Sequence, residues 1–169
     1  PVLSRAIAGI QAAIAETRGI AMNLRPTVLD DLGAASAIGW LCREFRQSYP
    51  SIRMNVRVEV DDRDIPDRLA TTLFRSVQEL LNNVAKHAQA NEVWVVLTRD
   101  ERLLCVEVSD DGVGLPPIDS SGARRYGHGI RNLRERSEMS GGRFSLVSPG
   151  GGTVARIEWS LNAADSTEA

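Results

Sequence analysis

The segment from Leu69 to His87 carries polar side chains whose spacing suits chemistry on a phosphate. At 100° per residue of a helix, Glu79, Asn83, Lys86 and His87 gather on one flank, beside the apolar stripe. Carboxylate and amide oxygens are ligands that Mg²⁺ prefers, and a lysine ammonium attracts phosphate as a point charge. The solvated shoulder of an ordinary amphipathic helix explains the same residues about equally well.

Glycine-containing stretches follow further along the chain. Asp110-Asp111-Gly112-Val113-Gly114 comes directly after a strand-like run, where a carboxylate can accept a hydrogen bond from an exocyclic amine such as that of adenine. Gly127-His128-Gly129 leads into a short helix, whose free N–H groups bind anions. Gly150-Gly151-Gly152-Thr153 adds a hydroxyl to a connection between strands. Each stretch alone is also common in plain turns and flexible loops.

The patterning between these stretches predicts a mixed domain. Helices are expected at residues 3–24, 32–45, 69–87 and 130–139, and strands at 52–60, 92–98, 103–109, 143–148 and 153–161. We expect Asp30 and Asp31 to cap the second helix, whose apolar face begins at Leu32, and Asp61–Asp64 to form a solvated turn. The fold class is therefore α+β: a two-layer α/β sandwich with a mixed, largely antiparallel sheet and helices on one face.

Composition limits the class of protein. The 169 residues suffice for one domain with a helical appendage, and 43% hydrophobic with 25% charged residues is typical of a globular chain. The net charge of -2 argues against direct nucleic-acid binding, and no apolar run is long enough to span a bilayer, so no membrane contact is expected. Low cysteine content favours a reducing, cytoplasmic location, even if a parent protein is membrane-anchored. Because the chain begins at Pro1 without a signal pattern, we interpret it as a fragment.

The first helical segment has a narrow apolar seam. Leu3, Ile7, Ile10 and Ile14 alternate steps of four and three residues, which is the a/d pattern of a coiled coil or helix bundle. A seam this narrow favours assembly with another helix over packing on its own domain.

In order and spacing, these motifs together resemble the N, G1, G2 and G3 boxes of the GHKL ATPase superfamily, which has the Bergerat fold. Residues 78–88 resemble the N box of sensor histidine kinases that partner helix-turn-helix (NarL/LuxR-type) response regulators. Residues 24–33 resemble the junction to their dimerisation helices, and residues 127–136 their G2 box. The resemblance divides the chain into the second helix of a dimerisation hairpin (1–26), an ATP-binding catalytic domain (27–161) and a disordered tail (162–169).

The resemblance implies an adenine pocket built by the later motifs. Asp110 would bind the adenine amino group directly. Gly112 and Gly114 would shape the pocket, and Thr153 would support it through its hydroxyl or a water. The segment between Gly114 and Gly127 would be the ATP lid.

The resemblance also implies a phosphate end of the site, with ATP and Mg²⁺ as cofactors. Asn83 would give its side-chain oxygen to Mg²⁺, and Lys86 and His87 would reach phosphates. The glycines of 127–129 would let the lid close over the β- and γ-phosphates, with His128 in the same cofactor site. Glu79, the candidate catalytic residue, would orient Mg²⁺-bound water or the incoming imidazole.

The phosphoacceptor motif of this family, a histidine followed by an acidic residue, does not occur in the sequence. His87 is followed by Ala88 and His128 by Gly129. The resemblance therefore implies an acceptor upstream of Pro1, in a parent protein histidine kinase. Its expected partners are its own phosphoacceptor helix, in a homodimer, and a helix-turn-helix response regulator. The chain by itself is not expected to autophosphorylate.

Two other functions of the same ATP-binding fold stay open. One is a serine/threonine kinase that inactivates a sigma-factor antagonist, although such a kinase does not need the seam of residues 3–26. The other is a non-catalytic ATP-dependent switch or dimerisation module, against which the small size and short lid count. A nucleotide-free adaptor is disfavoured because all four boxes are intact.

Overall fold

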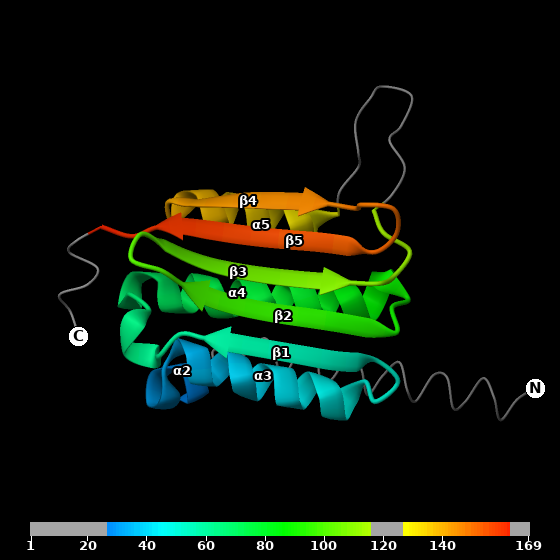
Figure 1. The fold of residues 1–169 in the computed structure, drawn as a ribbon, viewed down its shortest axis with the longest axis horizontal. Helices are drawn as coiled ribbons and strands as arrows, with labels where there is room; N and C mark the ends of the chain where they lie inside the picture. The colour runs from blue at the N-terminus through cyan, green and yellow to red at the C-terminus, as the bar shows by residue number, and fades with distance from the viewer. Residues whose placement is uncertain (1–26, 116–126, 163–169) are drawn as a thin grey trace, which may run out of the picture.

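The computed structural model describes residues 27–115 and 127–162 (Figure 1). The predictions for the seam helix, for most of the ATP lid and for the tail beyond residue 162 lie outside the described residues. The elements are α2 (Thr27–Leu32), α3 (Ala34–Ser48), β1 (Arg53–Glu59), η1 (Asp62–Asp64), α4 (Asp67–Asn83), η2 (Val84–Ala88), β2 (Glu92–Arg99), β3 (Leu103–Asp110), α5 (His128–Met139), β4 (Gly142–Val147) and β5 (Thr153–Ser160).

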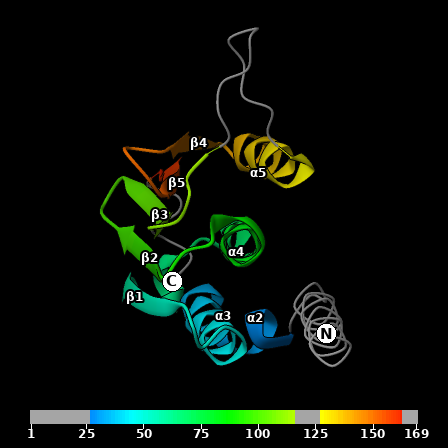
Figure 2. The ribbon, with the colours of Figure 1, turned by 90° about the vertical axis from the view of Figure 1, so that its right-hand side faces the viewer.

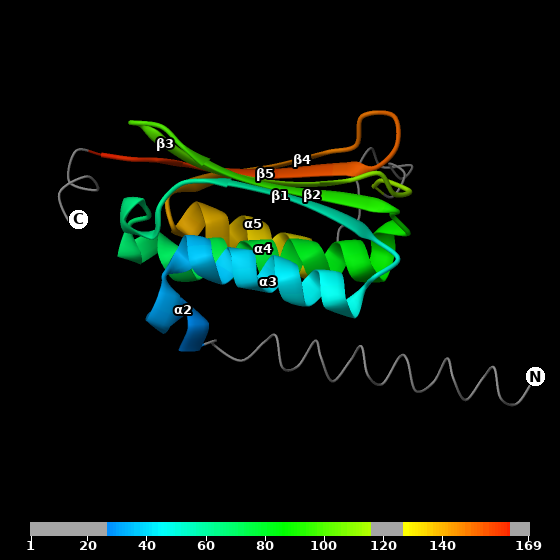
Figure 3. The same cartoon turned by 60° about the horizontal axis from the view of Figure 1, so that its bottom comes forward.

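The strands form one five-stranded sheet in the order β1-β2-β3-β5-β4. Only β1 and β2 pair in parallel, and the other neighbours are antiparallel. Helices α3, α4 and α5 cover one face of this sheet, as Figures 2 and 3 show. The predicted two-layer α/β fold with a mixed, largely antiparallel sheet is therefore confirmed.

Helix α4 lies at the centre of the helical layer and supplies much of the core. Leu69, Leu73, Val77 and Leu81 are fully buried on its inner face. They face the alternate, inward-pointing side chains of β2 and β3: Val93, Val95, Leu97, Leu104, Val106 and Val108. Burying a side chain of this kind contributes about 1.5–3 kcal/mol, so the sheet holds α4 firmly.

The N-cap predicted for the second helix is wrong. Asp30 lies within the short helix α2, and α3 begins after Gly33. The cap comes instead from Asp62, whose Oδ1 accepts hydrogen bonds from the backbone N–H groups of Ala35 (2.6 Å) and Ser36 (3.1 Å). The predicted solvated turn thus satisfies the free donors at the start of α3.

Two apolar predictions also fail at the edge of the domain. Leu32 has 53% of its surface exposed, because it ends α2 before the buried face of α3 begins. Met54, Val56 and Val58 occupy alternate positions of the predicted strand 52–60, which predicts a shared buried face, but Val56 and Val58 are 37% and 36% exposed while Met54 is buried. Since β1 is an edge strand, it has a neighbouring strand on one side only, and its alternation overstates its burial.

The structure confirms a helix over residues 69–87, but its last residues are not α-helical. Its last residues, Val84–Ala88, form a π-helical turn, and Gln89 follows in the left-handed region with φ 51°. A π-helical turn inserts an extra residue into the helical repeat and is frequent at functional sites. Lys86 and His87 therefore leave the flank at directions that a 100° spacing does not give.

Candidate functional site

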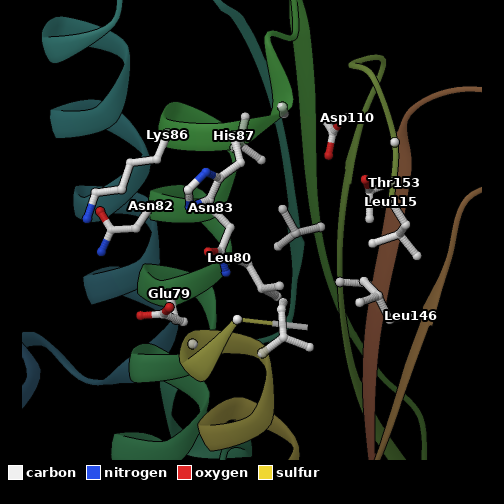
Figure 4. Close-up of a pocket in the computed structure, with 18 of the residues that line it drawn as sticks. Glu79, Leu80, Asn82, Asn83, Lys86, His87, Asp110, Leu115, Leu146 and Thr153 are labelled. Carbon is white, nitrogen blue, oxygen red and sulfur yellow. The ribbon is translucent and has the colours of Figure 1, made fainter. Parts of the chain in front are cut away.

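A cleft of about 700 Å³ opens between the C-terminal end of α4, the start of α5 and the adjoining ends of β3 and β5 (Figure 4). Every predicted site residue except Gly112 lines it: Glu79, Asn83, Lys86, His87, Asp110, Gly114, Gly127, His128, Gly129 and Thr153. The structure thus brings together residues that are up to 74 positions apart in the sequence, from Glu79 to Thr153.

Asp110 and Thr153 form the strand side of the cleft. They are paired in the antiparallel register of β3 and β5, and the Thr153 hydroxyl donates a hydrogen bond to the Asp110 carboxylate. The N–H of Gly112 donates a second hydrogen bond to Asp110 Oδ1 (2.9 Å). Burial nevertheless raises the pKa of Asp110, because desolvation, together with the nearby charge of Asp111, outweighs the hydrogen bonds from Gly112 and Thr153. The carboxylate therefore has a strong preference for a further donor.

Gly112 supports the site from behind. A Cβ at this position would collide with the carbonyl oxygen of Ala88, and that oxygen accepts a hydrogen bond from Val113 N–H (2.8 Å). The loop after Asp110 thus rests directly on the π-helical turn at the end of α4. The role predicted for Gly112 in shaping an adenine pocket stays a prediction.

Asp111, the other acidic residue of this loop, does not line the cleft. Its Oδ1 accepts hydrogen bonds from the backbone N–H groups of Asn91 and Glu92, each at 2.8 Å. Asp111 therefore secures the start of β2, and the two neighbouring carboxylates have separate tasks.

The end of α4 supplies the opposite wall. The Nδ2 atom of Asn83 is buried and has no hydrogen-bond partner among the described residues. A buried donor left unpaired costs about 1–3 kcal/mol, so this amide is placed to bond with a group from outside the described residues. His87 and Lys86 are exposed, and in Figure 4 the Lys86 side chain extends on the side of α4 away from Asp110.

The start of α5 closes the lower part of the cleft against α4. A Cβ at Gly129 would collide with Glu79 Oε1, and it would lie 3.7 Å from Asn83 Oδ1. A glycine here lets α5 begin next to both side chains without displacing the Glu79 carboxylate. The free N–H groups of the first turn of α5 therefore lie next to the polar flank of α4.

The contact between His128 and Arg131 shows which ring nitrogen of His128 accepts a hydrogen bond. Arg131 Nη2 lies 3.1 Å from His128 Nδ1. Because a guanidinium has donors only, Nδ1 accepts in this pair, and the hydrogen of a neutral ring lies on Nε2. The histidine can thus donate from Nε2 to an anionic ligand.

Sequence reasoning missed the apolar walls of the cleft. They are formed by Leu80, Val84, Val108, Val113, Leu115, Ile130, Leu146 and Ala155. Apolar walls beside the Asp110 carboxylate suit an aromatic base with an amino group. The strand alternation of Val108 and Ala155 placed both on the inner face, but nothing local distinguishes core from cleft wall.

The donor set fits a metal that arrives with a nucleotide. Across residues 27–115 and 127–162, no group of three or more His, Cys, Asp and Glu side chains is placed to hold a metal ion. Asn83 Oδ1 offers one hard oxygen next to the start of α5. Mg²⁺ typically takes one or two protein oxygens and completes its shell with phosphates and waters, so this sparse site is compatible with it.

Comparison with known proteins agrees with this geometry. A family profile described as "Histidine kinase-, DNA gyrase B-, and HSP90-like ATPase" matches residues 68–163, more than half of the chain. The chain belongs to this ATPase family. The matched region contains the end of α4, the end of β3 with the loop after Asp110, the start of α5 and the start of β5, which together form the cleft.

Within the family, the relatives of this ATPase domain are sensor kinases. It is 34% identical over 156 residues to the sensor histidine kinase MctS of Rhizobium johnstonii, covering 90% of this chain and 33% of that protein. It is 38% identical over 134 residues to the histidine-protein kinase/phosphatase UhpB of Salmonella typhimurium, covering 79% of this chain and 26% of that protein. The predicted resemblance to sensor histidine kinases is confirmed, and the chain spans about a third or less of these relatives.

A solved structure supports the fold of the ATPase domain. The histidine kinase domain of the blue-light activated histidine kinase EL346 from Erythrobacter litoralis superposes with a TM-score of 0.66 at 23% identity, covering 81% of this chain and 69% of that one. Among the described residues, no helix combines the length and apolar character needed to cross a bilayer.

Proposed function

We propose that this domain binds ATP with Mg²⁺ and donates the γ-phosphate to a histidine of a two-component sensor kinase, outside the 169 residues of the chain. The observation that carries the proposal is the cleft itself, in which a desolvated carboxylate on β3 faces an unpaired buried amide on α4. The relatives named above are histidine kinases, which favours this function over a serine kinase or a non-catalytic switch.

The adenine end of the proposed site lies at Asp110. Its carboxylate accepts a hydrogen bond from the exocyclic amine of adenine, and Thr153 holds the carboxylate in place. The apolar walls, among them Leu115 and Leu146, cover the two faces of the ring. Guanine presents a carbonyl oxygen where adenine has its amine, so the same carboxylate disfavours it.

The phosphate end lies between α4 and α5. Asn83 gives Oδ1 to Mg²⁺, and its unpaired Nδ2 donates to a phosphate oxygen. The first N–H groups of α5 and His128 Nε2 supply further donors, and Lys86 and His87 reach in from the rim. Bound Mg²⁺ supplies charge neutralisation for the phosphates. Transfer of a phosphoryl group depends mainly on such positioning and charge stabilisation.

Glu79 is the proposed catalytic residue. It lies one helical turn before Asn83 and against Gly129, at the mouth of the cleft where α4 meets α5. As the γ-phosphoryl group moves from ADP to the acceptor, Glu79 orients the attacking imidazole by accepting its ring hydrogen bond. The acceptor histidine comes from the protein's own dimerisation helix, and a helix-turn-helix response regulator receives the phosphate. Because the proposed reaction uses ATP, we expect it to take place in the cytoplasm.

A phosphotransfer assay in trans tests the function. The chain is incubated with γ-labelled ATP, alone and with a polypeptide that carries the dimerisation helix and acceptor histidine of the parent protein. We expect no label on the chain and an acid-labile, base-stable label on the helix, as phosphohistidine requires. A base-labile phosphoserine on a separate protein would support the serine kinase instead. A label on His87 or His128 would show that the acceptor lies within the chain.

The metal role of Asn83 has its own test. Asn83→Ala removes both the oxygen proposed for Mg²⁺ and the amide donor. Loss of a hydrogen bond to a charged group costs about 1.5–3 kcal/mol, so ATP affinity with Mg²⁺ should fall by at least tenfold. The loss should be smaller without Mg²⁺, which calorimetric titration in EDTA measures. Equal affinities with and without Mg²⁺ in the parent and the variant would remove the metal role.

A further inference from the structure

Ser148 lies at the start of the β4–β5 connection and does not itself line the cleft. Its hydroxyl donates a hydrogen bond to the carbonyl oxygen of Gly152 (2.5 Å). The Ser148 Oγ atom itself accepts a longer hydrogen bond from the backbone N–H of Leu115 (3.4 Å). One hydroxyl thus joins two segments that are 33 residues apart, and Leu115 is a wall of the cleft.

The glycines around Ser148 leave no spare room. Gly114 has φ +77°, and a Cβ there would collide with Ser148 Oγ. Gly152 has φ +71°, and a Cβ there would collide with the carbonyl oxygen of Asp110. The N–H of Gly152 donates to the carbonyl oxygen of Gly112 (2.7 Å). Gly152 is therefore held between Ser148 on one side and the Asp110 loop on the other.

The next residue along the chain is Thr153, whose hydroxyl donates to the Asp110 carboxylate. A shift of Gly152 would move Thr153 along β5 and change its alignment with Asp110. We propose that Ser148 is a positioning residue of the nucleotide site, which holds Gly152 and Leu115 together and thereby aligns Thr153, Asp110 and the apolar wall with the adenine ring. This inference rests on the proposed function.

A plain hairpin role accounts for only part of these contacts. A serine that merely closed the turn would need its bond to Gly152, four residues on. The bond from Leu115 adds nothing to the hairpin, but it ties the last described residue before the lid segment to the adenine side. The two roles predict different losses in a variant without the hydroxyl. If Ser148 only closes the hairpin, the stability of the fold decreases. If it positions the site, nucleotide affinity and the preference for adenine decrease.

Ser148→Ala, Ser148→Thr and a control, Ser145→Ala, test the inference. Ser145 lies exposed on β4, the strand that leads to Ser148, and its substitution removes a hydroxyl away from the cleft. Calorimetric titrations of ADP, ATP and GTP with and without Mg²⁺ give the affinities, and thermal unfolding of the ligand-free protein gives its stability.

We expect Ser148→Ala to weaken ADP and ATP binding by about three- to tenfold, the effect of one lost hydrogen bond on a binding equilibrium. The loss should be the same with and without Mg²⁺, because it acts at the adenine end. The preference for ATP over GTP should shrink, Ser148→Thr should restore both properties, and Ser145→Ala should change neither.

Two results would overturn the inference, and they are distinguishable. If Ser148→Ala lowers the unfolding temperature while its nucleotide affinity and ATP preference match the parent, the serine only closes the hairpin. If the parent chain binds no adenine nucleotide, the proposed function fails and this inference fails with it.

Discussion

At the end of the sheet where Arg99 and Leu103 lie, the polar groups bond to one another, whereas at the end where Asp110 and Thr153 lie, several of them face the cleft. We call these the far end and the site end. Both are built from the same strands, β2, β3 and β5, so strand register alone does not explain the difference. The difference lies in which connections and helix ends meet there.

The far end is internally satisfied. Asp62 caps α3, and the guanidinium of Arg99 donates to the carbonyl oxygen of Asp64 (2.5 Å). The indole Nε1–H of Trp159, a fully buried side chain, donates to Ser140 Oγ (2.8 Å). Buried polar groups are stabilising only when they are paired in this way.

The site end is left incomplete. Burial raises the pKa of Asp110, the Nδ2 atom of Asn83 has no partner among the described residues, and Gln89 adopts a left-handed conformation. Each feature costs folding free energy, and the groups of Asp110 and Asn83 gain a partner once a ligand with a donor, an acceptor or a phosphate enters. The comparison shows where the domain gives up stability for binding.

The largest expected effect is at Asp110. Asp110→Asn removes the negative acceptor for the adenine amine, and ATP affinity should fall by about 1.5–3 kcal/mol in calorimetric titration. Because folding raises the pKa of Asp110 above its ordinary value of 3.8, the folded state retains the proton longer and the parent loses stability as the pH rises through that window. At a pH above the raised pKa of Asp110, the Asp110→Asn variant, which is neutral at this position, should unfold at a higher temperature than the parent. A variant that binds ATP normally would show that the pocket assignment is wrong.

An intermediate effect is expected at the far end, where a substitution should lower stability and leave nucleotide affinity unchanged. Asp62→Ala leaves the first N–H groups of α3 without their acceptor, which should lower the free energy of unfolding by about 1–2 kcal/mol. Nucleotide affinity should not change, because α3 does not line the cleft. Asp61→Ala is the matched control, since Asp61 makes no side-chain cap. A loss of ATP affinity in Asp62→Ala alone would break the separation between the two ends.

The smallest effect is expected at Gln89. Its φ of 51° is costly for a residue with a Cβ, and Gln89→Gly removes that cost while adding freedom to the unfolded chain. The net result should be a gain of about 0.5 kcal/mol in chemical denaturation. ATP affinity should stay the same, because Gln89 lies just past the cleft-lining turn. A variant that binds more weakly would show that the strained residue itself aligns the π-helical turn.

The sequence alone determined most of the regular elements and the membership of the site. The hydrophobic period of α4 and the alternation in β2 and β3 depend on residues a few positions apart, so local patterning predicts them correctly. The motifs around Asn83, Asp110, Gly129 and Thr153 are each common, but their joint order resembles an ATPase family and so predicted residues that now line one cleft. Their binding roles stay predictions.

Tertiary structure decided how those residues are held. The α3 cap comes from Asp62, 26 to 27 residues away from the N–H groups it accepts, and the Leu115 bond to Ser148 spans 33 residues. The exposure of Val56 depends on β1 being an edge strand, and the burial of Asn83 Nδ2 without a partner among the described residues depends on which segments pack around it. A local pattern records the face on which a side chain lies, but only packing of distant segments determines which group that side chain meets.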